Sequence, residues 1–363
     1  MIPILLLDLG KEMRGGQWQV YYLARALAHS GEFAPIVAAP SSSPLLEHVA
    51  EVSGVRIVPL GDREWDPRSL YALRRLVRRE GVRILHSHCA KSATLATLGK
   101  KFWPAEVLLV HSRRVSYPLK PGWRGKKYSM ADAVVGVSRE ISEVVIASGV
   151  PAERVLTIHS GIDRCRYTPR RDRGDGRKVI GMVGAFTPQK GQDVLVRALA
   201  ELDAAYTDLP PWEVRFIGTG ELFGSVSALA AELGVDTHIA MLGRQDSRVF
   251  LPDFDLLVVP SVEGEGSSGT IKEGWAVGLP VVCSDLPSNL ELVENDRNGL
   301  VFPNRDHTQL ARLLARLLTD APLRERLVVE GGRSADAFSD LRMAAAYMDL
   351  YRTLAARPAG MAV

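Results

Sequence analysis

Short runs of apolar residues alternate with longer amphipathic stretches along this 363-residue sequence. Runs of strand length lie at 4–7, 36–39, 55–59, 84–87, 107–111 and 133–137, and helical periodicity dominates between them. Parallel strands need a crossover connection, which a helix usually supplies. The alternation therefore predicts an α/β protein whose parallel sheets carry helices on both faces.

The charged segment 167–178 (YTPRRDRGDGRK) interrupts this alternation. It has almost no apolar residue and is predicted to be an interdomain linker. Strand-like runs resume at 179–183, 213–217, 239–242, 256–259 and 280–283. We therefore expect one domain at 1–168 and a second at 179–339. Two parallel sheets in tandem favour a ligand site in the cleft between them, at the carboxyl ends of the strands.

Composition excludes several other classes of protein. Hydrophobic residues make up 46% of the chain and charged residues 24%, as in a globular protein rather than a disordered or collagenous one. Three widely spaced cysteines form neither a disulfide framework nor a metal-binding pair, which favours a reducing cytoplasm. The run at 4–7 is too short for a signal peptide, and no run approaches the ~20 residues that span a bilayer. Any membrane contact is expected to be peripheral.

The formal net charge of +3 is the sum of two opposed halves. Residues 1–164 carry 23 Lys and Arg against 15 Asp and Glu, a net of +8, which leaves −5 for residues 165–363. A basic first half and an acidic second half indicate two domains with different partners.

The segment 261–285 (SVEGEGSSGTIKEGWAVGLPVVCSD) combines two carboxylates with a run of small residues. Seven residues separate Glu265 from Glu273, and the small residues 266–270 stand just ahead of a predicted helix. Free N–H groups at a helix start attract anions, and small side chains let a phosphate approach. Glu273 can accept hydrogen bonds from a sugar or ribose diol. By composition alone, an ordinary surface loop capped by Ser or Thr fits equally well.

In its context this segment resembles the donor-site motif of family-4 retaining glycosyltransferases, a Glu-x7-Glu pattern followed by a Gly-Leu-Pro-Val-Val strand. Gly15-Gly16 resembles the family's first glycine loop, and 160–163 (SGID) resembles the stretch before its linker. Other resemblances follow in the family's order at 183–191 (VGAFTPQKG), 216–220 (FIGTG), 242–244 (LGR), 255–261 (DLLVVPS) and 298–301 (NGLV). The matches run from about residue 10 to residue 302.

The resemblance implies the GT-B fold, in which two Rossmann-like domains face each other across a cleft. The first domain would bind the acceptor and the second the nucleotide-sugar donor, with a last helix at 340–357 packing back on the first. The resemblance further implies front-face transfer with retention of configuration from a UDP-, GDP- or ADP-sugar. No cofactor and no metal are implied. The Asp-x-Asp pair Asp253 and Asp255 abuts the strand 256–259, and Asp255 matches an ordinary strand-start aspartate, so we assign no metal motif there.

The resemblance also assigns roles to residues. Lys190 would bind the donor diphosphate, Glu265 the hydroxyls of the transferred sugar, and Glu273 the ribose. His111 would orient that sugar, so the implied catalytic set is Lys190, Glu265 and His111. The implied donor-binding set is Gly15, Gly16, Gly184, Lys190, Gly218, Gly243, Arg244, Glu265, Ser268, Gly269, Thr270, Ile271 and Glu273.

Three features depart from the family's pattern. Ala185 stands where an arginine is common, so one expected cation at the diphosphate is missing. Lys272 stands where an apolar residue is common and is expected to be solvated. Gly274 and Trp275 replace the usual Ala-Met after the second glutamate, which predicts altered packing rather than altered chemistry.

Basic and aromatic residues are mixed in the stretch 113–127, which suits anionic headgroups and phosphorylated glycolipids. We interpret Arg113, Arg114 and His88 as acceptor-binding residues, and the arginine-rich helix at 74–79 as a solvated surface. The expected acceptor is a glycolipid or polysaccharide, as in lipopolysaccharide or other cell-surface glycan synthesis. The expected location is cytoplasmic and peripheral on an anionic inner membrane. No nucleic-acid partner is expected, because no dedicated motif for one appears.

The leading hypothesis is a metal-independent hexosyl- or related glycosyltransferase. Two alternatives stay open: a GT-B protein of another activity, such as an epimerase, and a nucleotide-sugar-binding protein that has lost turnover, which Ala185 allows. A dinucleotide oxidoreductase is disfavoured, because Gly-x-Gly-x-x-Gly is absent from the first strand–helix turn. A nucleotide-binding screen followed by a product assay separates these hypotheses.

Overall fold

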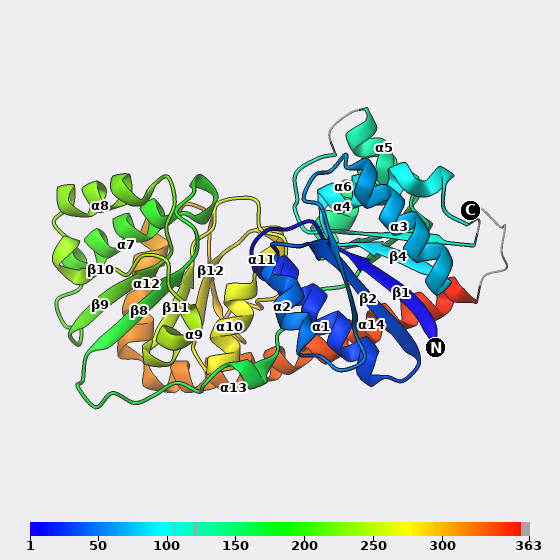
Figure 1. Ribbon diagram of the computed structural model, residues 1–363. Helices are drawn as coiled ribbons and strands as arrows, with labels where there is room; N and C mark the ends of the chain where they lie inside the picture. Colours follow the sequence, from blue (N-terminus) through cyan, green and yellow to red (C-terminus); the bar gives the residue numbers. More distant parts are fainter. Residues whose placement is uncertain (105, 120–121, 357–363) are drawn as a thin grey trace. The chain divides into compact units, whose positions relative to one another are not determined.

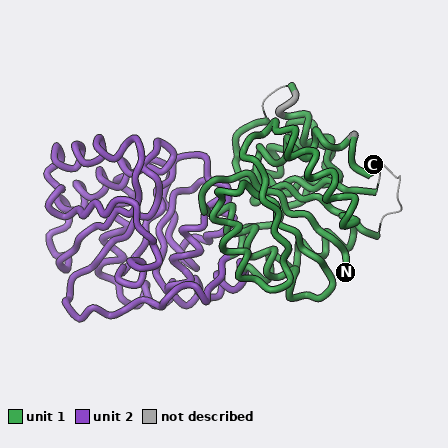
Figure 2. Tube along the Cα trace, viewed as in Figure 1, with its two compact units in different colours: residues 1–161, 340–363 green, residues 162–339 purple. Residues whose placement is uncertain are grey.

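The computed structural model describes residues 1–104, 106–119 and 122–356 (Figure 1). The chain divides into two compact units (Figure 2). Unit 1 comprises Met1–Gly161 together with the chain from Asp340 onward, and unit 2 comprises Ile162–Ser339. Each unit is built on a parallel sheet, which confirms the predicted α/β class.

In the described part of unit 1, seven parallel strands form one sheet in the order β3-β2-β1-β4-β5-β6-β7. The strand order reverses beside β1, as in doubly wound sheets, so the crossover helices cover both faces. The strands are β1 (Ile2–Leu7), β2 (Phe33–Pro40), β3 (Arg56–Leu60), β4 (Ile84–Ser87), β5 (Leu108–Arg113), β6 (Ala133–Gly136) and β7 (Val155–Thr157).

The helices of unit 1 are α1 (Gly15–His29), α2 (Pro44–Ala50), α3 (Pro67–Glu80), α4 (Ala90–Leu98), η1 (Gly99–Lys101), α5 (Trp123–Ser129), α6 (Arg139–Ala147), η2 (Ala152–Arg154) and α14 (Asp340–Ala355). Alternate side chains of β1 enter two different cores, because successive strand residues point to opposite faces. Ile4 and Leu6 pack with α1, α2 and α14, whereas Leu5 and Leu7 pack with α3, α4 and α6.

Six parallel strands form the sheet of unit 2 in the order β10-β9-β8-β11-β12-β13. The strands are β8 (Lys178–Val183), β9 (Trp212–Ile217), β10 (Ile239–Met241), β11 (Leu256–Val259), β12 (Val281–Ser284) and β13 (Leu300–Phe302). The helices are η3 (Arg164–Arg166), η4 (Pro188–Lys190), α7 (Gln192–Ala205), α8 (Phe223–Glu232), η5 (Asp236–His238), α9 (Ser247–Phe250), η6 (Leu251–Asp253), α10 (Gly269–Val277), α11 (Pro287–Leu290), α12 (His307–Thr319) and α13 (Ala321–Ala337). One core joins the sheet to α7, α8 and α12, and a second joins it to α10.

The charged segment 167–178 belongs to unit 2 and runs along its surface, so it is not a free linker. Arg170 and Arg173 donate to the two carboxylate oxygens of Asp255, at 2.5 and 2.6 Å. The amide of Val179 also binds this carboxylate, which is 3% exposed. The chain passes between the units after Gly161, earlier than the boundary at 168 that the sequence indicated, because these arginines find a buried partner instead of solvent.

The last helix, α14, packs against α1 in unit 1. At its start, Arg25 donates to Asp340 at 2.7 Å. Further along, the Tyr351 hydroxyl lies 2.6 Å from Nδ1 of His86 at the centre of the sheet. Residue 357, at the end of the predicted helix 340–357, lies outside the described residues. Within the described part of the chain, no helix is long and apolar enough to span a bilayer.

Candidate functional site

Three glycine turns meet at the carboxyl ends of β8, β9 and β10. The Gly184 amide donates to the Ile217 carbonyl at 2.9 Å, and the Gly218 amide donates to the Gly243 carbonyl at 2.7 Å. Gly218 has a φ of +142°, and a Cβ there would lie 1.9 Å from the Gly184 oxygen. Only glycine fits this position. The structure thus brings together Gly184, Gly218 and Gly243, and exposed Arg244 follows directly.

Lys190 and Glu265, which are distant in sequence, meet beside these turns. The Lys190 Nζ lies 2.5 Å from Glu265 Oε1, and Ser261 Oγ donates to the same oxygen at 2.5 Å. Gly191 places the lysine by adopting a left-handed φ of +66° against the Pro260 carbonyl. Glu265 is 8% exposed, whereas the lysine side chain is 32% exposed. The pair can therefore offer an ammonium group to a ligand while the carboxylate stays fixed.

Helix α10 begins directly after this pair. Ser268 caps the helix and accepts a hydrogen bond from the Ile271 amide at 3.5 Å. The Ile271 side chain is fully buried in the core, and its amide is the donor to Ser268. Gly269 and Thr270 occupy the first turn, where helical N–H groups have no intrahelical acceptor. These two amides are the anion-binding candidates of the turn.

Glu273 lies one turn further along α10. Ser247 Oγ lies 3.5 Å from Glu273 Oε2. Burial raises the pKa of Glu273, while hydrogen bonds from Tyr167 and Ser247 and the nearby Arg166 charge oppose that rise. None of these three neighbours is indicated by the sequence, because Arg166, Tyr167 and Ser247 all stand far from Glu273 along the chain.

The raised pKa makes Glu273 a destabilising group at neutral pH. Deprotonation costs more in the folded than in the unfolded chain, so stability falls as pH rises above the ordinary value of 4.5. We expect Glu273→Gln to have a higher melting temperature than wild type at pH 8. The difference should vanish below about pH 4, where both side chains are neutral. Thermal melts across pH test this, and a variant less stable than wild type at pH 8 would contradict it.

The unusual Gly274-Trp275 pair is explained by packing. Trp275 is 1% exposed, and its indole N–H donates to the Asn298 carbonyl at 2.9 Å. Gly331 on α13 makes room for the ring, since a Cβ there would lie 2.5 Å from Trp275. Gly274 faces the sheet, since a Cβ there would lie 2.8 Å from Leu257 Cδ2. Gly331 thus accommodates the aromatic ring, and Gly274 lets α10 pack closely on β11 and β12.

Lys272 differs from the expectation of a solvated side chain, because it is 1% exposed. Its Nζ donates to Ser267 Oγ at 2.6 Å and lies 5.5 Å from the centre of the Phe338 ring. Local sequence gives no sign of this burial, since Phe338 stands far along the chain.

In unit 1, Gly15 and Gly16 begin α1 at the carboxyl end of β1. A Cβ on Gly16 would lie 3.4 Å from Arg114 Cδ, so the side chain that reaches the glycine loop is Arg114. Beneath the loop, buried Asp8 accepts hydrogen bonds from the Gly10 amide and from Gln17. Burial raises the pKa of Asp8.

His111 lies in β5, as the apolar run 107–111 indicated, and its side chain is buried. The side chain has no exposed surface, and its ring nitrogens bind Ser87 Oγ at 2.8 Å and Thr97 Oγ1 at 3.0 Å. Burial lowers the pKa of His111 to about 3, so the imidazole is neutral. As folded here, His111 packs between β5 and α4 and presents no atom to a sugar.

Of the predicted acceptor residues, Arg113 and His88 are buried, whereas Arg114 reaches the glycine loop. Arg113 is 7% exposed and donates to the Tyr117 carbonyl, so it packs inside unit 1 rather than facing an acceptor. His88 is 2% exposed, and its ring centre lies 3.9 Å from that of His86, with the rings tilted by 38°. Burial holds the pKa of His88 well below 6.5. Lys127 is also buried and donates to Thr94. The stretch 113–127 is therefore not one exposed basic surface; Lys120 and the side chains of Trp123 and Arg124 lie outside the description.

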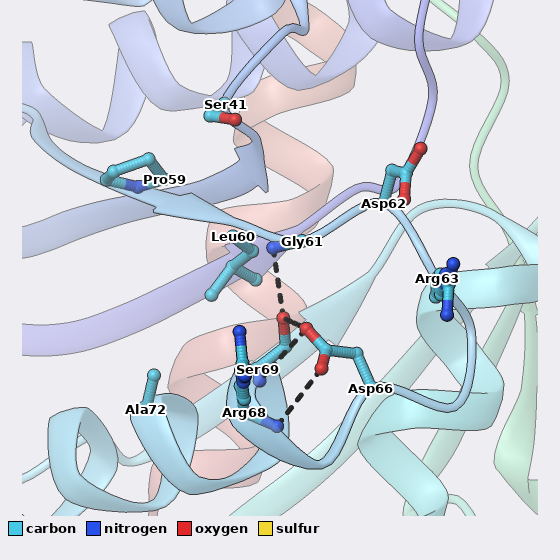
Figure 3. A pocket seen from close by; sticks show the side chains of 10 residues that line it. All are labelled: Ser41, Pro59, Leu60, Gly61, Asp62, Arg63, Asp66, Arg68, Ser69 and Ala72. Atoms are coloured by element: carbon cyan, nitrogen blue, oxygen red, sulfur yellow. Dashed lines mark hydrogen bonds between the residues drawn. The ribbon is translucent and has the colours of Figure 1, made fainter.

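A cavity of about 720 Å³ lies at the start of α3 in unit 1 (Figure 3). Asp66 caps the helix by accepting from the Arg68 and Ser69 amides, and Ser69 Oγ in turn accepts from the Gly61 amide. The Asp66 carboxylate thus binds the amides at the N-terminus of α3. Among the described residues, no group of His, Cys, Asp and Glu could hold a metal ion.

Two Rossmann-like units, the second with a lysine-bearing glycine loop and a Glu-x7-Glu helix, define a GT-B glycosyltransferase. A sequence profile described as Glycosyltransferase Family 4 matches residues 13–166, and one described as Glycosyl transferases group 1 matches residues 166–333. The two profiles together span most of the sequence. The chain belongs to this glycosyltransferase family.

Relatives and solved structures agree with this assignment. The chain is 29% identical over 252 residues to a lipopolysaccharide core biosynthesis glycosyltransferase of Rhizobium meliloti, covering 68% of this chain and 70% of the relative. It is 30% identical over 278 residues to a D-inositol 3-phosphate glycosyltransferase of Stackebrandtia nassauensis, covering 67% and 62%. The Anabaena protein HepE, solved with UDP-glucose, superposes with a TM-score of 0.80 at 17% identity, over 97% of this chain and all of that one. This last likeness shows the fold.

Proposed function

We propose that this protein is a retaining glycosyltransferase that moves a sugar, such as a hexose, from a nucleoside-diphosphate sugar to a phosphorylated glycolipid or polysaccharide. The observation that carries the proposal is the Lys190–Glu265 contact at the start of α10. It joins a partly exposed cation, a fixed carboxylate and first-turn amides, which suit a diphosphate and an attached sugar.

Sugar transfer breaks the bond between the anomeric carbon and a phosphate oxygen, so negative charge develops on the leaving diphosphate. Lys190 and the amides of Gly269 and Thr270 would stabilise that charge. Glu265 would bind hydroxyls of the transferred sugar, and Glu273 would bind the ribose diol. In the retaining reaction the acceptor attacks the front face, and the leaving phosphate takes the acceptor's proton. This scheme requires no metal and no protein nucleophile.

The donor is proposed to be a UDP-, GDP- or ADP-sugar. The turns at Gly184, Gly218 and Gly243 offer backbone groups to a nucleotide, and backbone contacts alone do not select among these bases. HepE, which shares the fold, was solved with UDP-glucose. That likeness supports UDP as the first nucleotide to test.

The acceptor is proposed to bear phosphate, in the synthesis of lipopolysaccharide or another cell-envelope glycan. Arg114, beside the glycine loop of unit 1, is the cation in position to bind it, and His88 lies nearby. Two relatives are named for a lipopolysaccharide core and for D-inositol 3-phosphate, and both names fit an anionic acceptor. In this proposal Arg114 replaces His111 and Arg113 as the polar contact of unit 1.

The function is tested in two stages. Calorimetry with UDP, GDP and ADP should show binding of at least one, and the matching sugar nucleotides should then yield free nucleoside diphosphate when phosphorylated glycolipid acceptors are added. Binding without turnover would favour the second candidate, a nucleotide-sugar-binding protein without activity, to which Ala185 points. Absence of nucleotide binding would contradict both.

The protein is further proposed to be cytoplasmic and to touch an anionic membrane through α3. Leu73, Leu76 and Val77 of this helix face the core, while Arg75, Arg78 and Arg79 are exposed. Nearby, Tyr71 is 68% exposed. Arginines beside an exposed aromatic ring suit anionic headgroups, so α3 replaces the stretch 113–127 as the proposed contact surface.

Reversing two charges on α3 should weaken this contact. Each basic residue near an anionic surface contributes about 1 kcal/mol, so Arg75→Glu with Arg78→Glu should lower binding to phosphatidylglycerol vesicles at least about tenfold. Co-sedimentation measures the effect. The control is a double reversal of Arg312 and Arg316 on α12, which changes the net charge equally. An equal loss in both double variants would mean that only net charge matters.

A further inference from the structure

The cavity of about 720 Å³ in unit 1 takes no part in the proposed donor site (Figure 3). Two of its lining residues place it at the carboxyl ends of neighbouring strands, because Ser41 directly follows β2 and Gly61 directly follows β3. The loop that joins β1 to α1 lies at the same edge, since all three strands are parallel. Ligands of open parallel sheets bind at this edge, and the volume is in the ordinary range of ligand sites.

A second cavity, of about 380 Å³, adjoins the first. It is lined by parts of the segment 9–17, which contains the loop after β1, and by residues 89–91 at the start of α4. Lys11 lines this smaller cavity, and its Nζ lies 2.5 Å from Oδ2 of Asp62, which lines the larger one. The two side chains are 56% and 44% exposed, and an ion pair as open to water as this adds little stability. A ligand that spans both cavities can therefore replace it.

The larger cavity offers both hydrogen-bond donors and acceptors, which belong to Ser41, Asp62, Arg63, Asp66 and Arg68. Two carboxylates would repel a phosphate, and two guanidinium groups would repel a metal ion. A sugar hydroxyl both donates and accepts, so a lining of mixed charge suits a neutral, hydroxyl-rich ligand. Both arginines are exposed and can turn toward such a ligand.

One side of the larger cavity is held by hydrogen bonds. Asp66 accepts from two amides at the start of α3 and from Ser69 Oγ, so the helix N-terminus is already bound by a carboxylate. Gly61 permits this approach, because a Cβ there would lie 2.4 Å from Asp66 Oδ2. Figure 3 shows these hydrogen bonds, with Asp62 and Arg63 set apart from them. A ligand would therefore be bound mainly by side chains of the loop 61–66.

The loop 61–66 also carries an exposed tryptophan. Trp65 is 61% exposed and stands between Arg63 and Asp66, which both line the cavity. One face of a pyranose ring presents C–H groups, which pack against aromatic rings, while its hydroxyl groups stay free for hydrogen bonds. An aromatic ring beside side chains of mixed charge therefore favours a sugar over a phosphate.

We propose that the larger cavity is a subsite for a distal sugar of the acceptor, held by Trp65, Arg63 and Asp62. The acceptor is then a chain of sugars that runs along the carboxyl edge of the unit 1 sheet, from the smaller cavity beside β1 to the larger one beside β3. A one-sugar acceptor would leave the larger cavity empty. This inference rests on the proposed function, because it concerns the acceptor of the same reaction.

The experiment is calorimetry on the full chain with lipid-free core oligosaccharides of increasing length, from a single sugar upward, prepared from lipopolysaccharide. Leaving out the lipid removes any contribution from the proposed membrane contact of α3. We expect wild-type affinity to rise about tenfold along the series, and Trp65→Ala and Arg63→Gln each to reduce that gain to under about threefold. The gain should persist in high salt, because contacts with neutral hydroxyls are not screened.

Phe102→Ala and Arg312→Gln are the matched controls. Phe102 is a 47% exposed aromatic side chain of unit 1 that follows α4, and Arg312 is an exposed arginine on α12 in unit 2. Both controls should keep the full gain in affinity with length. All four side chains are at the surface, so thermal melts should show that every variant folds like wild type.

Equal wild-type affinity for every length, or a gain that survives in both Trp65→Ala and Arg63→Gln, would overturn the subsite. A gain that disappears in high salt would indicate an anion at the cavity and would overturn it as well. A wild-type protein that releases no nucleoside diphosphate from any sugar nucleotide would instead refute the proposed function, and this inference with it.

Discussion

Lys190→Met is expected to lower kcat by about 10²–10³-fold, the range found when one preorganised donor to a developing negative charge is removed. Lys190 is the partly exposed cation at the proposed leaving diphosphate, and methionine has a similar length without the charge. KM for the donor should rise less than kcat falls, because the leaving group gains charge only as the bond breaks. Steady-state and single-turnover release of nucleoside diphosphate measure the two effects.

The control for this substitution is Lys178→Met in the same unit. The Lys178 side chain has comparable exposure and lies 3.8 Å from Asp255, which belongs to the fold and not to the site. Its kcat should stay within about twofold of wild type. A Lys190→Met enzyme that keeps near-normal kcat, or a Lys178→Met enzyme that loses as much, would remove Lys190 from the proposed mechanism.

Asp255→Asn is expected to destabilise unit 2 by about 3 kcal/mol, the lower end of the cost of breaking a buried ion pair. Asp255 is 3% exposed and binds Arg170 and Arg173, whose partial exposure to water moderates the loss. For a unit of this size, the melting temperature should fall by about 6–12 °C. Differential scanning calorimetry measures the shift.

The effect should depend on pH. Burial alone would raise the pKa of Asp255, but hydrogen bonds from Arg173, Val179 and Arg170 leave it below its ordinary value of 3.8. A lowered folded-state pKa means that the stabilisation is present at neutral pH and is lost as pH falls below about 4. Asp253→Asn is the control. Asp253 is more exposed than Asp255, and its ion pair with Arg171 has a long distance of 3.8 Å, so the pair contributes under about 1 kcal/mol. If both variants melt alike at pH 7, Asp255 does not anchor the segment 167–178.

Much of the fold could be predicted from periodicity. The apolar runs anticipated most strands of both sheets, because strands buried on both faces are nearly continuous in apolar residues. The short strands β7 and β13 were not anticipated, although β10, which has the same length, was. The segment 167–178 was interpreted as a linker because it is charged, contains Pro and Gly and has almost no apolar residue. Its partner Asp255 stands far along the chain.

The candidate site could be predicted in part. The glycines at 184, 218 and 243 and the pair Lys190 and Glu265 are brought together at one edge of the sheet, as their places after successive strands indicated. The direction of side chains could not be predicted in the same way. In the segment 110–114 (VHSRR), the side chains of His111 and Arg113 are buried, whereas the side chain of Arg114 reaches Gly16.

The sequence by itself determined the class of fold, the family, and the positions where glycine is required, because these depend on local periodicity, motif spacing and backbone conformation. The tertiary structure alone decided which charged groups are buried and what they bind. Lys272 is enclosed because Phe338 packs over it, and Asp255 is paired because Arg170 and Arg173 return to it. Burial is a property of contacts between distant segments, so no local pattern could have revealed either one.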